Sequence, residues 1–193
     1  MRRHGHTLVE ILVAISILGI LTGAILFLYV TGGRAVAQGD MRGELLRQLQ
    51  LAASRMSREM ETSAFDSVSS SASAVAMMSA VPASGGGSPT LSPDGSIIWQ
   101  KYIVYWHDSA TRTLNRREYA VPPTTSAQPI ENWQSLTLAD YTNGGDVIGR
   151  EIVAFTVANP VDTRRLEVSM TGEQIFRGEP RQHSLKFAIR FKN

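Results

Sequence analysis

An uncharged apolar run near the N-terminus constrains this chain more than any other feature. Residues 11–30 contain no charged side chain and no histidine, and Ile, Leu and Val dominate them. A helix of this length spans roughly 30 Å, the thickness of the hydrocarbon core of a bilayer. Arg2 and Arg3 precede the run, which favours a cytoplasmic N-terminus for a membrane helix. We therefore expect one membrane helix, with the rest of the chain on the other side of the membrane.

Two simpler interpretations of this segment stay open. Ala35, Val36 and Ala37 form a possible signal-peptidase site, so the run could belong to a cleaved secretory signal peptide. An ordinary signal peptide has an apolar core of about 7–15 residues, and this run is longer. The second interpretation is a plain signal anchor, which only holds the chain in the membrane.

Glu10 separates these interpretations, because it lies at the cytoplasmic edge of the apolar run. Placing an acidic side chain at the centre of a membrane helix costs about 2.5–3.5 kcal/mol on insertion scales, and less near the edge. Such a residue therefore suggests a function. The local alternative is that Glu10 lies among the lipid headgroups and interacts favourably with the dipole of its own helix.

The residues around Glu10 resemble a known family. Residues 5–10, Gly-His-Thr-Leu-Val-Glu, resemble the prepilin cleavage and methylation motif of type IV pilins and type II secretion pseudopilins. In that family, prepilin peptidase removes a short basic leader after the glycine, and the new N-terminal residue is N-methylated. The resemblance implies that residues 1–5 are the leader, that Gly5 precedes the cut, and that His6 becomes the methylated terminus. His6 stands where the family usually has phenylalanine.

The same resemblance implies an assembly role for Glu10. In the family, this glutamate helps to neutralise the N-terminal amine of a neighbouring subunit. A cut after Gly5 would create an amine about one helical turn from Glu10, and staggered helices would bring the amine of one chain to the carboxylate of the next. A buried ion pair adds little net stability, because desolvation opposes the attraction. It would instead set the register of assembly, since only one stagger satisfies both charges.

The segment 32–62 predicts an amphipathic continuation of the transmembrane helix, which we place at 6–31. Glycines at 32, 33, 39 and 43 predict a bend or looser stretch. Residues 46–60 resemble the corresponding helix of J-type minor pseudopilins and PilW-like minor pilins. Apolar residues at three- and four-residue spacing form a stripe that we expect to pack on a sheet: Leu45, Leu49, Ala52, Met56 and Met60.

The remaining sequence predicts the β part of an α+β fold, with a long N-terminal helix packed on an antiparallel sheet, as in pilins. Residues 63–96 are rich in Ser, Ala and Gly and predict a loop, with a short strand possible at 75–81. Residues 97–193 predict a β-sheet domain, with a turn at 107–111 and a strand end at Pro122 and Pro123. The expected strands are 97–106, 112–121, 133–138, 152–158, 165–171 and 184–191.

The sequence offers little for catalysis or for a cofactor. The chain has no cysteine, which excludes disulfides, thiolate catalysis and cysteine-ligated metals. His107, Asp108 and Ser109 have the residue types of a catalytic triad, but they fall in a predicted turn, and the chain has no G-x-S-x-G motif. Calcium binding at 140–146 stays open, although a turn is the simpler explanation because the EF-hand pattern is missing. We expect no enzyme activity, no cofactor, no metal and no small-molecule substrate.

The sequence therefore predicts a single-pass inner-membrane minor pilin or pseudopilin with a periplasmic or extracytoplasmic C-terminal domain. Its expected partners are prepilin peptidase and other pilin-like subunits of a pilus or pseudopilus, in type II secretion, a type IV pilus or competence. The net charge of +2 does not call for a nucleic-acid partner. The alternative is a secreted or anchored β-rich binding protein or hydrolase. A binding protein would gain support from an exposed aromatic groove around Trp99, Tyr102 and Trp106.

Overall fold

The computed structural model describes residues 7–82, 88–158, 164–176 and 178–191. The predicted leader at 1–5 and the predicted N-terminal residue His6 therefore lie outside the described residues. The chain forms two units, Met1–Gly43 and Glu44–Asn193.

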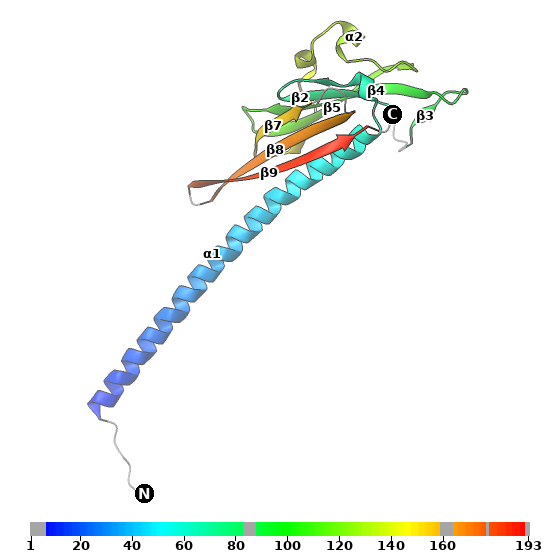
Figure 1. Cartoon of the computed structure of the whole chain (residues 1–193). Coiled ribbons are helices and arrows are strands. Elements are labelled where there is room, and N and C mark those ends of the chain that lie inside the picture. The colour runs from blue at the N-terminus through cyan, green and yellow to red at the C-terminus, as the bar shows by residue number, and fades with distance from the viewer. Residues whose placement is uncertain (1–6, 83–87, 159–163, 177, 192–193) are drawn as a thin grey trace. The chain divides into compact units, whose positions relative to one another are not determined.

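The described part of the first unit is the beginning of helix α1 (Leu8–Glu61), which has 54 residues in all (Figure 1). Its large apolar side chains are exposed around the whole helix, as Leu12 and Leu21 are. We expected a bend or a looser stretch at the glycines. The structure instead shows a continuous helix through Gly32, Gly33 and Gly39. A glycine in a helix costs about 1 kcal/mol relative to alanine, which is too little to interrupt a helix of this length.

The second unit combines the end of α1 with two antiparallel sheets. The larger sheet has the order β1 (Ser69–Ser70), β2 (Ala74–Ser79), β4 (Ile97–Asp108), β5 (Thr113–Thr124) and β6 (Asp146–Gly149), and β3 (Thr90–Leu91) also pairs with β4. The smaller sheet consists of β7 (Ile152–Ala158), β8 (Arg165–Phe176) and β9 (Glu179–Arg190). Three short helical turns complete the described elements: η1 (Phe65–Ser67), α2 (Glu131–Gln134) and η2 (Leu138–Tyr141).

The predicted Leu/Met stripe of α1 packs on the sheets, as expected. Leu49, Met56 and Met60 are fully buried. They share one core with side chains from the helix-facing sides of both sheets, among them Met77, Tyr105, Leu114, Phe155, Leu166, Met170 and Ile189. The long helix packed on antiparallel β-structure that the sequence predicted is thus confirmed.

A second core lies on the other face of the larger sheet. Because successive side chains of a strand point to opposite faces, Val75 and Met77 lie in the helix-side core, whereas Ala76 and Met78 lie in this one. Residues from α2, η2 and the segment before them cover this face, with Ile130 fully buried. Both faces of β2 and β4 are therefore covered, which explains why their sequences are continuous apolar runs without alternation.

Several strand predictions were wrong in detail. Residues 63–96 are more than a loop, because they contain the fully buried strand β2 as well as β1 and β3. Residues 133–138 are not a strand: α2 ends at Gln134, η2 begins at Leu138, and Thr137 and Asp140 form a capping box at the start of η2. Strand β5 does not end at Pro122 and Pro123 but continues to Thr124. The two prolines lie beyond the residues that pair with β6, so no hydrogen bond to β6 requires the N–H groups that prolines lack.

Candidate functional site

The start of α1 is closed by a capping box between Thr7 and Glu10. The backbone N–H of Thr7 donates to Oε2 of Glu10 at 2.9 Å, and the backbone N–H of Glu10 donates to Oγ1 of Thr7 at 3.3 Å. This reciprocal arrangement satisfies two N–H groups at the beginning of the helix. Glu10 therefore has a local role at the N-terminus of its own helix, as the simpler interpretation of the sequence proposed.

Glu10 can take part in the capping box and in other interactions, because a carboxylate accepts several hydrogen bonds. An ionised carboxylate has two oxygens with about four acceptor positions in all, which is more than the cap from Thr7 requires. A local cap and an ion pair with another amine are thus chemically compatible. Of the three residues predicted from the motif, the structure places Glu10, while Gly5 and His6 lie outside the described residues.

The helix after Glu10 meets the chemical requirements of a membrane span. It is long and apolar enough to cross a bilayer, and its apolar side chains are exposed. The hydroxyls of Ser16, Thr22 and Thr31 each donate to a backbone carbonyl one turn earlier, at 2.8 Å. Because lipid offers no partner to a polar group, such internal hydrogen bonds suit a helix within a membrane.

A cluster of buried charged residues lies elsewhere, where the end of α1 meets the larger sheet. Glu59 of α1 accepts hydrogen bonds from Tyr105 and from Nε of Arg116, the latter at 2.9 Å. Glu118 is hydrogen-bonded to Arg116 and forms an ion pair of 3.0 Å with Lys101. Lys101 and Arg116 are 5% and 6% exposed, so both cations depend on these carboxylates for compensation. Sequence reasoning missed this cluster, because charges on adjacent strands look like ordinary solvated residues.

The pKa shifts of Glu118 and Tyr105 indicate the protonation states of these two residues. Burial acts to raise the pKa of Glu118, but hydrogen bonds from Arg116 and Lys101 outweigh it and lower the pKa below its usual value. Burial raises the pKa of Tyr105, and the charge of Glu59 raises it further. Glu118 is therefore ionised and Tyr105 neutral at neutral pH. With each buried charge paired, the cluster serves to hold α1 on β4 and β5.

The histidine and acidic residues that suggested chemistry make local contacts. Nε2 of His107 lies 2.8 Å from the backbone oxygen of Ile152. Asp108 caps the hairpin turn, accepting hydrogen bonds from Ala110 and Thr111. Strand β4 extends through Asp108, so the turn begins later than the predicted 107–111. These contacts do not connect His107 to Ser109 in the manner of a triad.

The loop at 140–146 is organised around side chains of the chain itself. Asp140 accepts hydrogen bonds from the backbone and hydroxyl of Thr137. Nη1 of Arg117 donates to the backbone oxygen and to Oδ1 of Asn143, at 2.8 and 2.7 Å. The guanidinium of Arg117 thus binds both oxygens of Asn143, and Thr137 binds the carboxylate of Asp140. Among the described residues, no group of three or more His, Cys, Asp or Glu side chains is placed to hold a metal.

The aromatic residues considered for a binding groove are in the core. Trp99, Tyr102 and Trp106 are between 0% and 6% exposed. The hydroxyl of Tyr102 donates to the backbone oxygen of Gln128 at 2.7 Å, beneath the segment that covers this face. The exposed aromatic groove that would favour a binding protein is therefore not formed by these three residues.

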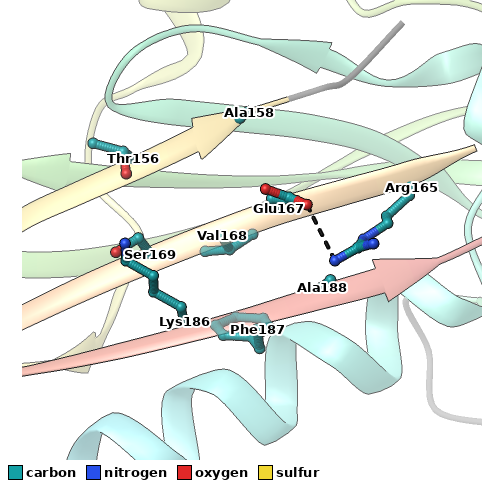
Figure 2. Close-up of a pocket in the computed structure, with 9 residues that line it drawn as sticks. All are labelled: Thr156, Ala158, Arg165, Glu167, Val168, Ser169, Lys186, Phe187 and Ala188. Atoms are coloured by element: carbon teal, nitrogen blue, oxygen red, sulfur yellow. Dashed lines mark ion pairs between the residues drawn. The ribbon is translucent and has the colours of Figure 1, made fainter. Parts of the chain in front are cut away.

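A shallow pocket of about 360 Å³ lies over the smaller sheet (Figure 2). Its most prominent charges, Arg165 and Glu167, pair with each other at 3.1 Å, and both side chains are about half exposed. The neighbouring row, Thr156, Ser169 and Lys186, consists of paired positions on the three strands. An open surface with a solvated ion pair offers little to select a ligand.

Comparison with known proteins gives a match at the N-terminus. Residues 1–26 match the family model described as the prokaryotic N-terminal methylation motif. No curated protein and no solved structure matches the chain. The matched motif is of the prepilin type, so the comparison supports a pilin-like chain, and it includes Gly5, His6 and Glu10.

Proposed function

We propose that this protein is a minor pilin or pseudopilin that assembles with other pilin-like subunits. The observation that carries this proposal is the methylation motif at residues 1–26, overlapping the beginning of an exposed apolar helix. A helix that is apolar all round needs lipid or neighbouring helices to cover it. A pilin-like subunit uses both, first in the inner membrane and then in a filament.

In this proposal, prepilin peptidase removes residues 1–5 on the cytoplasmic side and His6 becomes the methylated N-terminus. Glu10 then has two tasks. It caps its own helix through Thr7, and it receives the N-terminal amine of a neighbouring subunit. Within the family, a J-type pseudopilin or a PilW-like minor pilin is the subtype that we propose, on the resemblance of residues 46–60. We place the second unit on the periplasmic or extracytoplasmic side.

Mass spectrometry of the mature protein tests the processing step. We expect the N-terminal peptide to begin at His6 and to carry a methylated amine. Gly5→Ala should block the cut and leave the leader attached. A mature terminus at Gln38, after Ala35, Val36 and Ala37, would show ordinary signal-peptide cleavage and refute the proposal.

A pair of substitutions at Glu10 tests the assembly step. Glu10→Gln keeps an oxygen that can accept the hydrogen bond from Thr7, since glutamine also serves in capping boxes, but it removes the charge. We expect correct processing and membrane insertion, but loss of association with partner pilins. Leaving a buried amine without its counter-charge costs on the order of 3–5 kcal/mol.

Thr7→Ala is the matched control, because it removes the other half of the capping box and leaves the charge of Glu10 in place. It should cost about 0.5–2 kcal/mol of local helix stability and preserve partner association. Cross-linking and co-purification measure the difference between the two variants. If Glu10→Gln associates with partners at wild-type levels, Glu10 acts only on its own helix.

A further inference from the structure

A polar cavity of about 640 Å³ lies on the face of the larger sheet that carries the second core. Trp106 of β4 pairs with Asn115 of β5, and both side chains line the cavity. Because Trp106 belongs to the second core, this pair lies on the face turned away from the helix-side core. The turn between β4 and β5 and the loop before β6, with Gly144 and Gly145, complete the lining.

Asn115 gives the cavity an acceptor without a partner. The residue is only 8% exposed. Its Nδ2 donates to Oγ1 of Thr113 at 3.0 Å, but no described residue donates to its Oδ1. Polar atoms of buried residues in folded proteins nearly always have a hydrogen-bond partner. Oδ1 of Asn115 therefore depends on solvent or on a bound molecule for its hydrogen bond.

The threonine hydroxyls beside Asn115 are already committed as donors. Thr111 donates to Oδ2 of Asp108 at 2.8 Å, and this hydrogen bond is the main cause that lowers the pKa of Asp108. The hydroxyls of Thr111 and Thr113 lie 2.7 Å apart. Because Thr111 has no second hydrogen to give, Thr113 is the donor between them. These two hydroxyls therefore offer a ligand only lone pairs.

The glycine loop supplies donors to the same cavity. The backbone N–H groups of Gly144 and Gly145 have no hydrogen-bond acceptor among the described residues. The loop passes close to the indole of Trp106, since a Cβ added at Gly145 would lie 2.9 Å from its Cη2. Acceptors and backbone donors in one cavity suit hydroxyl groups, because a hydroxyl donates and accepts at once.

The charge of the cavity favours a neutral occupant. No lysine or arginine lines it, so a phosphate, sulfate or carboxylate would find neither as a counter-charge. The carboxylate of Asp108 already accepts hydrogen bonds from Ala110 and Thr111 within its turn. Trp106 and Val147 add apolar surface, and Val147 is 46% exposed. A neutral molecule with several hydroxyls and apolar ring faces fits this lining, which is the chemistry of a sugar.

We propose that this cavity binds a neutral glycan, a chain of sugars without phosphate, sulfate or carboxylate groups. One sugar ring enters the cavity, where a hydroxyl donates to Oδ1 of Asn115 and others accept from the backbone N–H groups of Gly144 and Gly145. The rim includes the exposed Ser109 and leaves the cavity open for the rest of the chain. The inference goes beyond the proposed assembly role and does not depend on it, because these residues lie outside the methylation motif.

An array of immobilised oligosaccharides tests the class of ligand. Tagged full-length protein is applied in a polyoxyethylene detergent, which carries no sugar headgroup. The array holds neutral oligosaccharides together with sialylated and sulfated ones. We expect binding to a subset of the neutral members. Binding to none of the array, or preferential binding to its sialylated or sulfated members, would overturn the proposal.

Substitutions then locate the binding in the cavity. Asn115→Leu removes the open acceptor and should lower the affinity for the best-bound neutral oligosaccharide roughly fivefold, with near-ultraviolet circular dichroism as the check on folding. Ser109→Leu adds bulk at an exposed position of the rim and should weaken binding by a similar factor.

Ala110→Leu is the matched control, because Ala110 is exposed in the same turn but does not line the cavity. It should leave the affinity unchanged. Biolayer interferometry with the same oligosaccharide measures all three variants. Equal affinities of Ser109→Leu and Ala110→Leu would refute binding in this cavity, whatever the result for Asn115→Leu.

Discussion

The two parts of α1 have the same backbone structure and different surfaces. In the first unit, Leu21 is 55% exposed, and apolar residues surround the helix. In the second unit, Leu49 is fully buried, and apolar residues are confined to the stripe that faces the sheets. The boundary between the units falls at Gly43 and Glu44, within the continuous helix.

This contrast shows that the helical pattern decides which partner an α-helix needs. An apolar stripe about 100° wide needs cover on one side of the helix only, and here the two sheets of the same chain provide it. A helix that is apolar on all sides cannot be covered by one domain face. The first part of α1 therefore requires a membrane or the helices of other subunits, while the second part is stable within its own unit.

Separating the two parts should have the largest effect. A fragment that begins at Gln38 retains the stripe of α1 and both sheets but lacks the apolar run. We expect this fragment to be soluble and folded without detergent, whereas the full-length chain requires detergent. Ultracentrifugal fractionation with circular dichroism measures both properties. Full-length protein that stays soluble without being cut would contradict the membrane assignment.

Matched leucine substitutions should show the same difference in energetic terms. Leu49→Ala removes a fully buried side chain and should lower the free energy of unfolding of the second unit by about 2–5 kcal/mol. Leu21→Ala should leave that free energy unchanged, because its side chain lies outside this core. Chemical denaturation in the same detergent compares the two variants. A similar loss in both would mean that the two parts of α1 unfold as one unit.

The sequence predicted those elements whose pattern has a single explanation. The apolar run was recognised by its length, and the Leu/Met stripe and the alternating strand at 165–171 by their period; the helix and the strand are found where they were expected. Strand β2 was underestimated because it is covered on both faces. Ala74, Ala76 and Ser79 are small enough to lie between two layers, but in the sequence they look like the surrounding loop.

The polar contacts could not be predicted, because they depend on tertiary register. The ion pair between Glu59 and Arg116 joins residues that are 57 positions apart. Only the packing of α1 on β5 brings them together. The motif around Glu10, in contrast, is local, and the contact between Thr7 and Glu10 follows from a spacing of three residues. A capping box can thus be recognised from local spacing, whereas the ion pair at the end of α1 cannot.

Glu118 on strand β5 and Glu10 in the first part of α1 give a third, smaller contrast. Glu118→Gln weakens the compensation of two buried cations and should lower the free energy of unfolding of the second unit by about 1.5–3 kcal/mol at pH 7. Glu10→Gln should leave the stability of this unit unchanged. Urea denaturation at pH 7 measures both effects. An equal loss in the two variants would show that the ion-pair cluster is not specific to the second unit.

The pH dependence follows from the sign of the pKa shift. The folded-state pKa of Glu118 lies below its unfolded value of about 4.3, so the unfolded state binds more protons in this range. The stability that Glu118 contributes is present above about pH 4.3 and is lost as the pH falls through the lowered folded-state pKa. Wild-type protein should therefore lose more stability than Glu118→Gln on acidification. If the free energy of unfolding fell equally with pH in the wild-type protein and in Glu118→Gln, this role of Glu118 would be contradicted.

Glycine substitutions should give the smallest effects, with opposite signs in the two units. Gly33 lies in the exposed part of α1, and apart from its chain neighbours and the adjacent backbone of its own helix, no described atom comes within 4 Å of the Cβ that an alanine would add. Gly33→Ala should therefore stabilise the helix by about 0.5–1 kcal/mol through helix propensity alone. Gly145 has φ +83°, and an added Cβ would lie 2.5 Å from the backbone oxygen of Arg116. Gly145→Ala should destabilise the second unit, by about 1–3 kcal/mol.

Hydrogen exchange near residue 33 and denaturation of the second unit measure these two changes. The result for Gly33 is the more informative one, because in a single chain no neighbouring described element packs beside this residue. If Gly33→Ala stabilises α1 and leaves association with partner pilins unchanged, this glycine makes no close contact in the assembly. If the variant instead loses association while its helix gains stability, the space beside Gly33 is filled by a neighbouring helix. The surroundings of the first part of α1 would then differ between the single chain, where no sheet covers this part, and the assembly, where a neighbouring helix does.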